Sequence, residues 1–140
     1  MKKAVIYDSN TGNTKAMAEA IAEGARESGA DVYFTRADQA DIEEAMSCDV
    51  LYLGCPAMGV EMVGDAQTDF CRAVGMGFSG KKVALFGSCA HCEGIWIRGW
   101  ASKIKAYGGK VVNSPGLICV LHPDETKLEE CRSLGRDGFP

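Results

Sequence analysis

Hydroxyl and amide side chains cluster in six consecutive residues near the start of the chain, Ser9-Asn10-Thr11-Gly12-Asn13-Thr14. They follow a short apolar run and precede a stretch with helical periodicity. Hydroxyl groups donate to phosphate oxygens, Gly12 allows a sharp turn of the backbone, and the free N–H groups of a helix start attract anions. The segment contains no lysine, so it is neither a Walker loop nor a Gly-x-Gly-x-x-Gly motif. We therefore expect it to bind a phosphomonoester through neutral donors, rather than to serve only as a helix cap.

The cysteine pair in Cys89-Ala90-His91-Cys92 is the second group with a spacing that suits chemistry. Two intervening residues are typical of dithiol oxidoreductases, and a nearby helix start lowers the pKa of a thiol. A metal site formed by these cysteines with His91 and His122 would lack the second paired cluster of a structural zinc site. We expect no metal, and the sequence leaves open whether Cys89 and Cys92 form a disulfide.

Length and composition describe an ordinary globular protein. The 140 residues include 15 Lys or Arg and 19 Asp or Glu, for a formal net charge of −4. We expect a single domain over residues 1–140, and the mild acidity argues against a nucleic-acid partner. No apolar run approaches the ~20 residues of a membrane span, and the first residues do not resemble a secretory signal, so we expect a cytoplasmic protein without a membrane partner. Seven cysteines, an odd number, argue against a disulfide framework, and Cys55 and Cys119 are expected to be buried.

Short apolar runs alternate with segments of helical periodicity. The expected strands are 4–7, 32–35, 50–53, 83–86 and a fifth strand split into 111–112 and 117–120. The expected helices are 15–27, 42–46, 67–74, 97–107 and one that opens at Pro123-Asp124. This alternation predicts an α/β fold of three layers, with an open, doubly wound, five-stranded parallel sheet. Such sheets bind ligands beyond the carboxyl ends of their strands, which directs attention to the loops after Tyr7, Leu53 and Phe86.

The hexapeptide resembles the Ser/Thr-x-Thr-Gly-x-Thr phosphate loop of flavodoxins, and the resemblance extends over essentially the whole chain. Residues 53–59 resemble the flavin-facing loop of short-chain, clostridial-type members, and residues 81–88 resemble the segment that enters their second flavin loop. The resemblance implies strand order 2-1-3-4-5, non-covalently bound FMN, and a low-potential one-electron carrier that is not an enzyme.

The resemblance also implies roles for individual residues. Met58 would lie against the inner face of the flavin, the Gly59 carbonyl would turn to accept a hydrogen bond from the flavin N5–H after reduction, and Glu61 would accept a hydrogen bond from the ring. His91 stands where close relatives carry an aromatic residue on the outer face. An imidazolium there would stabilise the anionic reduced flavin, so we expect a pH-dependent potential. The expected cofactor-binding residues are Ser9, Asn10, Thr11, Gly12, Asn13, Thr14, Pro56, Ala57, Met58, Gly59, Glu61, Ser88, Cys89, Ala90, His91 and Cys92.

Redox proteins that donate and accept electrons are the expected partners of a monomer. The alternative is a flavodoxin-like redox enzyme that uses the Cys89/Cys92 dithiol or acts as a flavin reductase. A reductase needs room for a second substrate, and a chain of this length carries no insertion to provide it. A regulatory module related to receiver domains is a further alternative, but it would need a phosphoacceptor aspartate, and Asp8 has no counterpart after the third strand.

Overall fold

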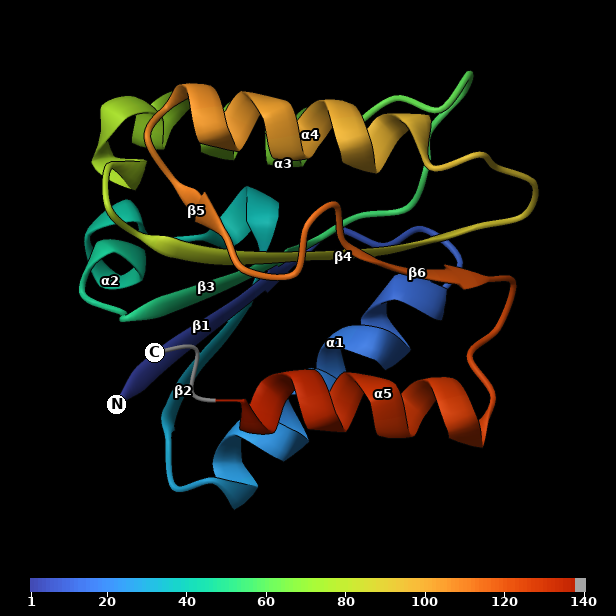
Figure 1. Ribbon diagram of the computed structural model, residues 1–140, viewed down its shortest axis with the longest axis horizontal. Helices are drawn as coiled ribbons and strands as arrows, with labels where there is room; N and C mark the ends of the chain where they lie inside the picture. Colours follow the sequence, from blue (N-terminus) through green and yellow to red (C-terminus); the bar gives the residue numbers. More distant parts are fainter. Residues whose placement is uncertain (138–140) are drawn as a thin grey trace.

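A parallel sheet runs through the middle of the molecule, and helices cover both of its faces (Figure 1). The computed structural model describes residues 1–137. The strands are β1 (Lys2–Tyr7), β2 (Asp31–Arg36), β3 (Val50–Gly54), β4 (Lys82–Cys89), β5 (Lys110–Val111) and β6 (Leu117–Val120). Their order is β2-β1-β3-β4-β5, with β6 also on β4, and all of these pairs are parallel. The predicted doubly wound α/β fold and its strand order are confirmed.

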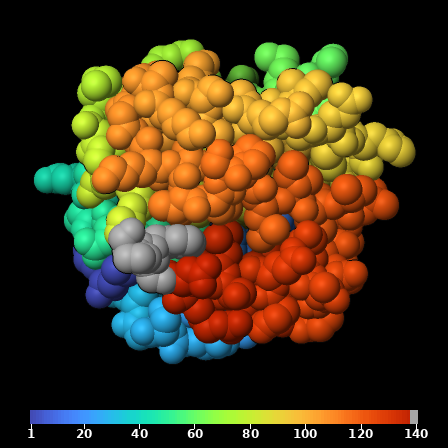
Figure 2. Space-filling model, in the orientation of Figure 1, coloured from blue at the N-terminus to red at the C-terminus, as the bar shows by residue number. Residues whose placement is uncertain are grey.

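Two short strands share the fifth position of the sheet, as the sequence predicts. β5 pairs with the start of β4 and β6 with its end. Between them, the side chain of Asn113 accepts a hydrogen bond from Leu85 N (3.0 Å) and donates one to Leu85 O (2.9 Å). The amide therefore continues the ladder of hydrogen bonds across the break. Figure 2 shows this segment, in orange, at the surface between helix α4 (Ile95–Ala106) in gold and helix α5 (Glu125–Arg136) in red.

The described part of the chain contains five α-helices, of which α1 to α4 lie between strands and α5 follows β6. They are α1 (Asn13–Glu27), α2 (Ile42–Met46), α3 (Asp65–Val74), α4 (Ile95–Ala106) and α5 (Glu125–Arg136), with short 3-10 helices η1 (Ala37–Gln39) and η2 (Gly75–Phe78). α1 and α5 cover one face of the sheet, and α3 and α4 cover the other (Figure 1). The predicted helices are all present, with starts that differ by two residues or fewer. Within residues 1–137, no helix has the length and apolar character needed to cross a membrane.

α1 and α5 approach each other closely at two glycines. A Cβ atom on Gly24 would lie 1.9 Å from Arg132 O, and one on Gly135 would lie 2.0 Å from Ile21 O. Both positions therefore need a residue without a side chain. Beside this crossing, the buried ammonium group of Lys3 in β1 donates to Gly135 O at 2.6 Å, which ties the first strand to the last helix.

Candidate cofactor-binding site

Three loops meet at the carboxyl ends of β1, β3 and β4. The loop after β1 contacts the end of β4 through Thr14 Oγ1 and Ser88 Oγ, which are 2.7 Å apart and buried. The loop after β3 joins them through Ala57 N, which donates to Ser88 O at 2.9 Å. The sequence places the end of β4 at Phe86, but the strand continues to Cys89 because β6 pairs with it there. The three loops form the region where doubly wound sheets bind their ligands.

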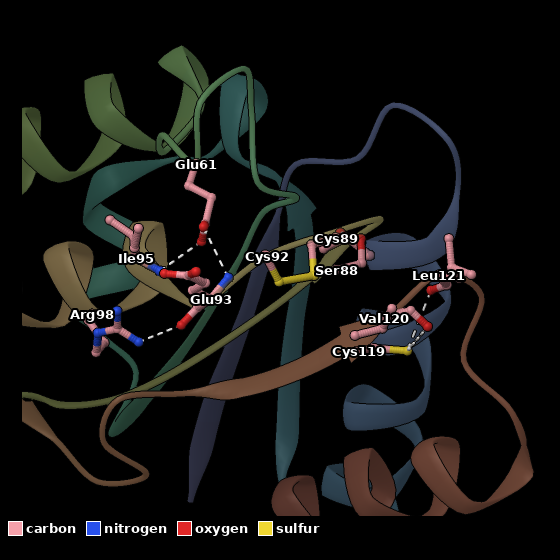
Figure 3. Close-up of a disulfide and its surroundings, with 11 residues drawn as sticks. Glu61, Ser88, Cys89, Cys92, Glu93, Ile95, Arg98, Cys119, Val120 and Leu121 are labelled. Carbon is pink, nitrogen blue, oxygen red and sulfur yellow. Dashed lines mark hydrogen bonds between the residues drawn. A yellow bond between two sulfur atoms is a disulfide. The ribbon is translucent and has the colours of Figure 1, made fainter.

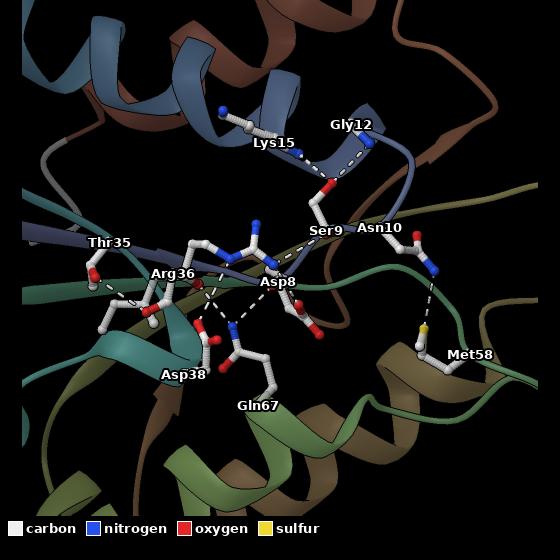
Figure 4. A network of polar contacts seen from close by, with 12 residues as sticks. Asp8, Ser9, Asn10, Gly12, Lys15, Thr35, Arg36, Asp38, Met58 and Gln67 are labelled. Atoms are coloured by element: carbon white, nitrogen blue, oxygen red, sulfur yellow. Dashed lines mark hydrogen bonds and ion pairs between the residues drawn. The ribbon is translucent and has the colours of Figure 1, made fainter.

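The loop after β1 presents unused hydrogen-bond donors. Gly12 precedes α1 with φ +95° and, as a glycine, has no side chain to cap the helix. Ser9 Oγ accepts hydrogen bonds from Gly12 N (3.1 Å) and Lys15 N (3.3 Å), as Figure 4 shows. Within residues 1–137, the N–H groups of Asn13 and Thr14 have no partner. A helix start with free N–H groups and adjacent hydroxyls is suited to an anion.

Two basic residues beside this loop were not predicted as part of the site. Arg36, at the carboxyl end of β2, donates through Nη2 to Asp8 Oδ1 (3.3 Å) and Ser9 O (3.2 Å) (Figure 4). His122 Nδ1 lies 3.2 Å from Asn13 Oδ1. The position of Arg36 could have been inferred, because β2 is the neighbour of β1 in the expected strand order. His122 gave no such signal, since its loop reaches Asn13 from the far end of the sequence.

Gln67 of α3 is a further residue of the site that sequence analysis missed. Its side chain is fully buried, and Nε2 donates to Ile6 O and Gly54 O, each at 2.9 Å (Figure 4). These two carbonyls lie at the carboxyl ends of β1 and β3. Gln67 therefore holds together the two strand ends from which the first two loops leave.

The loop after β3 is a tight hairpin. Pro56 is buried and Ala57 half-buried. Met58 and Met62 exchange two backbone hydrogen bonds of 2.9 and 2.7 Å, and Gly59 and Glu61 within the turn have φ values of +51° and +48°. Met58 Sδ also lies 3.8 Å from Asn10 Nδ2, so the hairpin touches the first loop (Figure 4).

The side chain of Glu61 links this hairpin to the start of α4. Its carboxylate accepts hydrogen bonds from Glu93 N (3.0 Å) and Ile95 N (2.7 Å), as Figure 3 shows. These bonds, above all the one from Glu93, hold the pKa of Glu61 below its usual value. Glu61 thus serves as the cap of α4, and its expected bond to a flavin ring stays a prediction.

Cys89 and Cys92 form a disulfide, which answers the question that the sequence left open (Figure 3). Their Cα atoms are 6.1 Å apart. Ala90 and His91, both exposed, lie between them. Within residues 1–137, no group of three or more His, Cys, Asp and Glu side chains is arranged to hold a metal ion.

The other cysteines of the described chain are free and buried: Cys48, Cys55, Cys71, Cys119 and Cys131. The predicted burial of Cys55 and Cys119 is confirmed. Burial raises the pKa of the Cys55 thiol to about 12 and that of the Cys71 thiol to about 11. These thiols are therefore protonated near neutral pH and are held away from solvent.

The donor set of the three loops fits a flavin mononucleotide. Neutral hydroxyl and N–H donors at the start of α1 suit the phosphate, and the one cation that contacts the first loop from β2, Arg36, is already paired with Asp8. The polarizable thioether of Met58 and the imidazole of His91 suit the faces of a flat aromatic ring.

Known proteins with similar sequences and structures point the same way. The family model described as Flavodoxin matches residues 5–135. The flavodoxin of Clostridium beijerinckii is 41% identical over 133 residues, which are 94% of this chain and 95% of that protein. The flavodoxin of Megasphaera elsdenii is 34% identical over 132 residues, covering 94% and 93%. The solution structure of two-electron reduced Megasphaera elsdenii flavodoxin superposes with a TM-score of 0.87 at 36% identity, over 97% of this chain and 96% of that chain.

The order of the strands, the three loops at their carboxyl ends and this similarity over nearly the full length lead to one assignment. The chain belongs to the flavodoxin family, of the short-chain, clostridial type, and is an electron carrier that binds FMN.

Proposed function

We propose that the three loops hold FMN and that the chain passes single electrons between redox proteins at low potential, without a substrate of its own. The observation that carries the proposal is the meeting of the loops through Thr14, Ser88 and Ala57. This contact puts the free donors at the start of α1 next to the hairpin and the disulfide loop. When bound, FMN supplies the centre that accepts and donates electrons.

Residues Ser9 to Thr14 would bind the phosphate. The N–H groups of Asn13 and Thr14 have no partner within residues 1–137. The Ser9 hydroxyl accepts two hydrogen bonds and keeps its own hydrogen available to donate. The positive end of the α1 dipole favours the negative charge of a phosphate at the same place.

Pro56 to Gly59 and Glu61 on one side, and Ser88 to Cys92 on the other, would enclose the ring. Met58 and His91 would pack on its two faces. Gly59 has φ +51°, a conformation that glycine adopts without the steric penalty of a Cβ, so a turn of its peptide costs less than at a residue with a side chain. A carbonyl that turns in this way can accept a hydrogen bond from a proton held on the ring nitrogen N5.

The surface around the hairpin supports protein partners. Val60 and Met62 at its tip are 92% and 64% exposed, and Ile95 at the start of α4 is 51% exposed. Exposed apolar side chains beside a redox centre suit brief contacts with other redox proteins. The net charge of −4 supports the absence of nucleic acid and of anionic membranes among the partners.

We further propose that the chain is a monomer that works in the cytoplasm and is not an enzyme. Five of the cysteines in the described residues are free and two form a disulfide, and this excess of free thiols supports a reducing compartment, because oxidising compartments favour paired cysteines. Family membership supports a role as carrier only.

The test is a titration of the protein with FMN, followed by stepwise anaerobic reduction with visible spectra at each step. We expect one FMN per chain and two separate one-electron steps. A single two-electron step would contradict the role of one-electron carrier, and no binding at micromolar FMN would contradict the assigned site.

A further inference from the structure

Among the cysteines of the described residues, solvent reaches the Cys89–Cys92 pair more than the others. The five free cysteines are 5% exposed or less and are therefore out of reach of a reactant. Of the disulfide pair, Cys89 is 8% exposed at the end of β4, whereas Cys92 lies in the following loop and is half-buried. A reagent that reacts with sulfur would therefore meet Cys92 first.

The disulfide constrains a segment that little else holds. Ser88 before it is fixed by Thr14, and Cys89 O accepts a hydrogen bond from Leu121 N at 2.7 Å. Glu93 after it is fixed by the Glu61 carboxylate (Figure 3). Between these anchors, Ala90 and His91 make no hydrogen bond to any residue in 1–137. The bond between the two sulfurs is thus the main constraint on Ala90 and His91.

We propose that the Cys89–Cys92 disulfide is a site of reversible thiol–disulfide exchange with a dithiol reductant, and that its reduction weakens flavin binding by releasing Ala90 and His91. The inference rests on the proposed function, because it takes these two residues as part of the flavin site. It assigns the cysteine pair a role beyond that of the electron carrier.

The exchange runs in two steps. A thiolate of the dithiol attacks Cys92 Sγ, the bond between the two cysteines breaks, and Cys89 leaves as a thiolate that takes a proton from water. The second thiol of the reductant then attacks the intermolecular disulfide and releases Cys92. The dithiol is oxidised to a disulfide, and its two electrons and two protons end on Cys89 and Cys92.

The effect on the flavin follows from conformational entropy. With the disulfide closed, Ala90 and His91 are ordered before the ligand arrives. With it open, binding must also remove their backbone freedom, and this cost is subtracted from the affinity. We expect the dissociation constant of FMN to rise roughly tenfold, equal to about 1.4 kcal/mol, which is of the order of fixing the backbone of one residue. By linkage, FMN must protect the disulfide from reduction by the same factor.

The first experiment measures FMN binding by flavin fluorescence with and without dithiothreitol. The matched control is the double variant Cys89→Ser/Cys92→Ser, which keeps the five buried cysteines. We expect dithiothreitol to weaken binding to the native chain and to leave the variant unchanged, at the weaker affinity. Equal affinity of the native chain in both states would overturn the coupling.

The second experiment does not need the variant, and its measurement without FMN does not depend on flavin affinity. Thiols are counted in the folded protein with a reagent that reacts only with accessible groups, at a fixed ratio of dithiothreitol to its oxidised form. We expect two new thiols on reduction, and about tenfold less reduction when FMN is saturating. No new thiols would overturn the exchange site. Failure of FMN to bind in either state would overturn the proposed function, and the thiol count would still decide whether exchange occurs.

Discussion

Thr14 Oγ1 and Ser88 Oγ are 2.7 Å apart in a buried position, although 74 residues separate them in the chain. Thr14 lies in the first turn of α1, and Ser88 lies near the end of β4. Neither hydroxyl reaches bulk solvent, so each depends on the other to complete its hydrogen bonding. This single contact sets the distance between the phosphate-binding loop and the loop that carries the disulfide.

Replacement of Thr14 by Val should destabilise the protein. The shape of the side chain is kept, but Ser88 Oγ is left buried without this partner, which costs about 1–3 kcal/mol in the free energy of unfolding. Thr14→Ser is the control and should be milder. Urea unfolding of Thr14→Val, Ser88→Ala and the double variant measures the coupling, and additive effects of the two changes would contradict a direct bond.

The two glycines at the crossing of α1 and α5 should not tolerate a methyl group. Gly24→Ala and Gly135→Ala force a Cβ against a backbone oxygen, so each should cost roughly 1–3 kcal/mol through overpacking. Gly99→Ala in α4 is the matched control, since nothing lies within 4 Å of its Cβ position. There the gain in helix propensity should stabilise the protein by about 0.5–1 kcal/mol. Thermal unfolding of the three variants shows whether each substitution lowers or raises the stability of the protein.

Because Glu61 caps α4, we expect the free energy of unfolding to depend on pH under acidic conditions. The pKa of Glu61 in the folded protein is lower than its usual value, so its contribution is complete above the usual carboxyl pKa and is lost as the pH falls through the folded value. The Glu61→Gln variant lacks this titration. Its stability should therefore approach that of the native protein as the pH falls below the usual carboxyl pKa. Parallel stability curves of the two proteins over this range would contradict the prediction.

His122 should affect the phosphate end of the ligand only. Its contact with Asn13 orders a residue of the phosphate loop, and a net hydrogen bond is worth about 0.5–1.5 kcal/mol, or roughly two- to tenfold in affinity. We therefore expect His122→Leu to weaken FMN binding to that extent. Riboflavin, which lacks the phosphate, is the control ligand, and an equal loss with both ligands would show that His122 acts elsewhere.

His91 should make the second reduction potential depend on pH. The imidazole is exposed, and its protonated form is a cation. A cation beside the ring would favour the more negative, reduced flavin. The potential of the native protein should therefore change more with pH than that of His91→Phe, measured by spectroelectrochemical titration. An identical dependence of the potential on pH in the two proteins would contradict a position of His91 beside the flavin ring.

Patterns in the sequence were sufficient where structure is local. The alternation of apolar runs predicted every strand and α-helix of the described chain, though not the 3-10 helices or the full length of β4, and it predicted the split of the fifth strand because Pro115-Gly116 interrupts the apolar run. Contacts across the chain were not predictable in this way. The Glu61 carboxylate accepts hydrogen bonds from two residues that follow it in the sequence by 32 and 34 positions. The roles of Gln67 and His122 likewise depend on how distant elements pack. The spacing of Cys89 and Cys92 permits a disulfide but does not require one, so that only the structure decides it.

The close crossing of α1 and α5 has a consequence for the order of events during synthesis. The ribosome makes β1 and α1 first, but the helix that covers α1 comes in the last part of the chain. Until Gly135 and Asp137 have emerged, Lys3 Nζ lacks both of these carbonyl partners, and the part of the sheet face that α5 covers lies open to water. This side of the interior therefore cannot close before α5 is made, and removal of Gly135 and Asp137 would cost the Lys3 ammonium group both of these carbonyl partners.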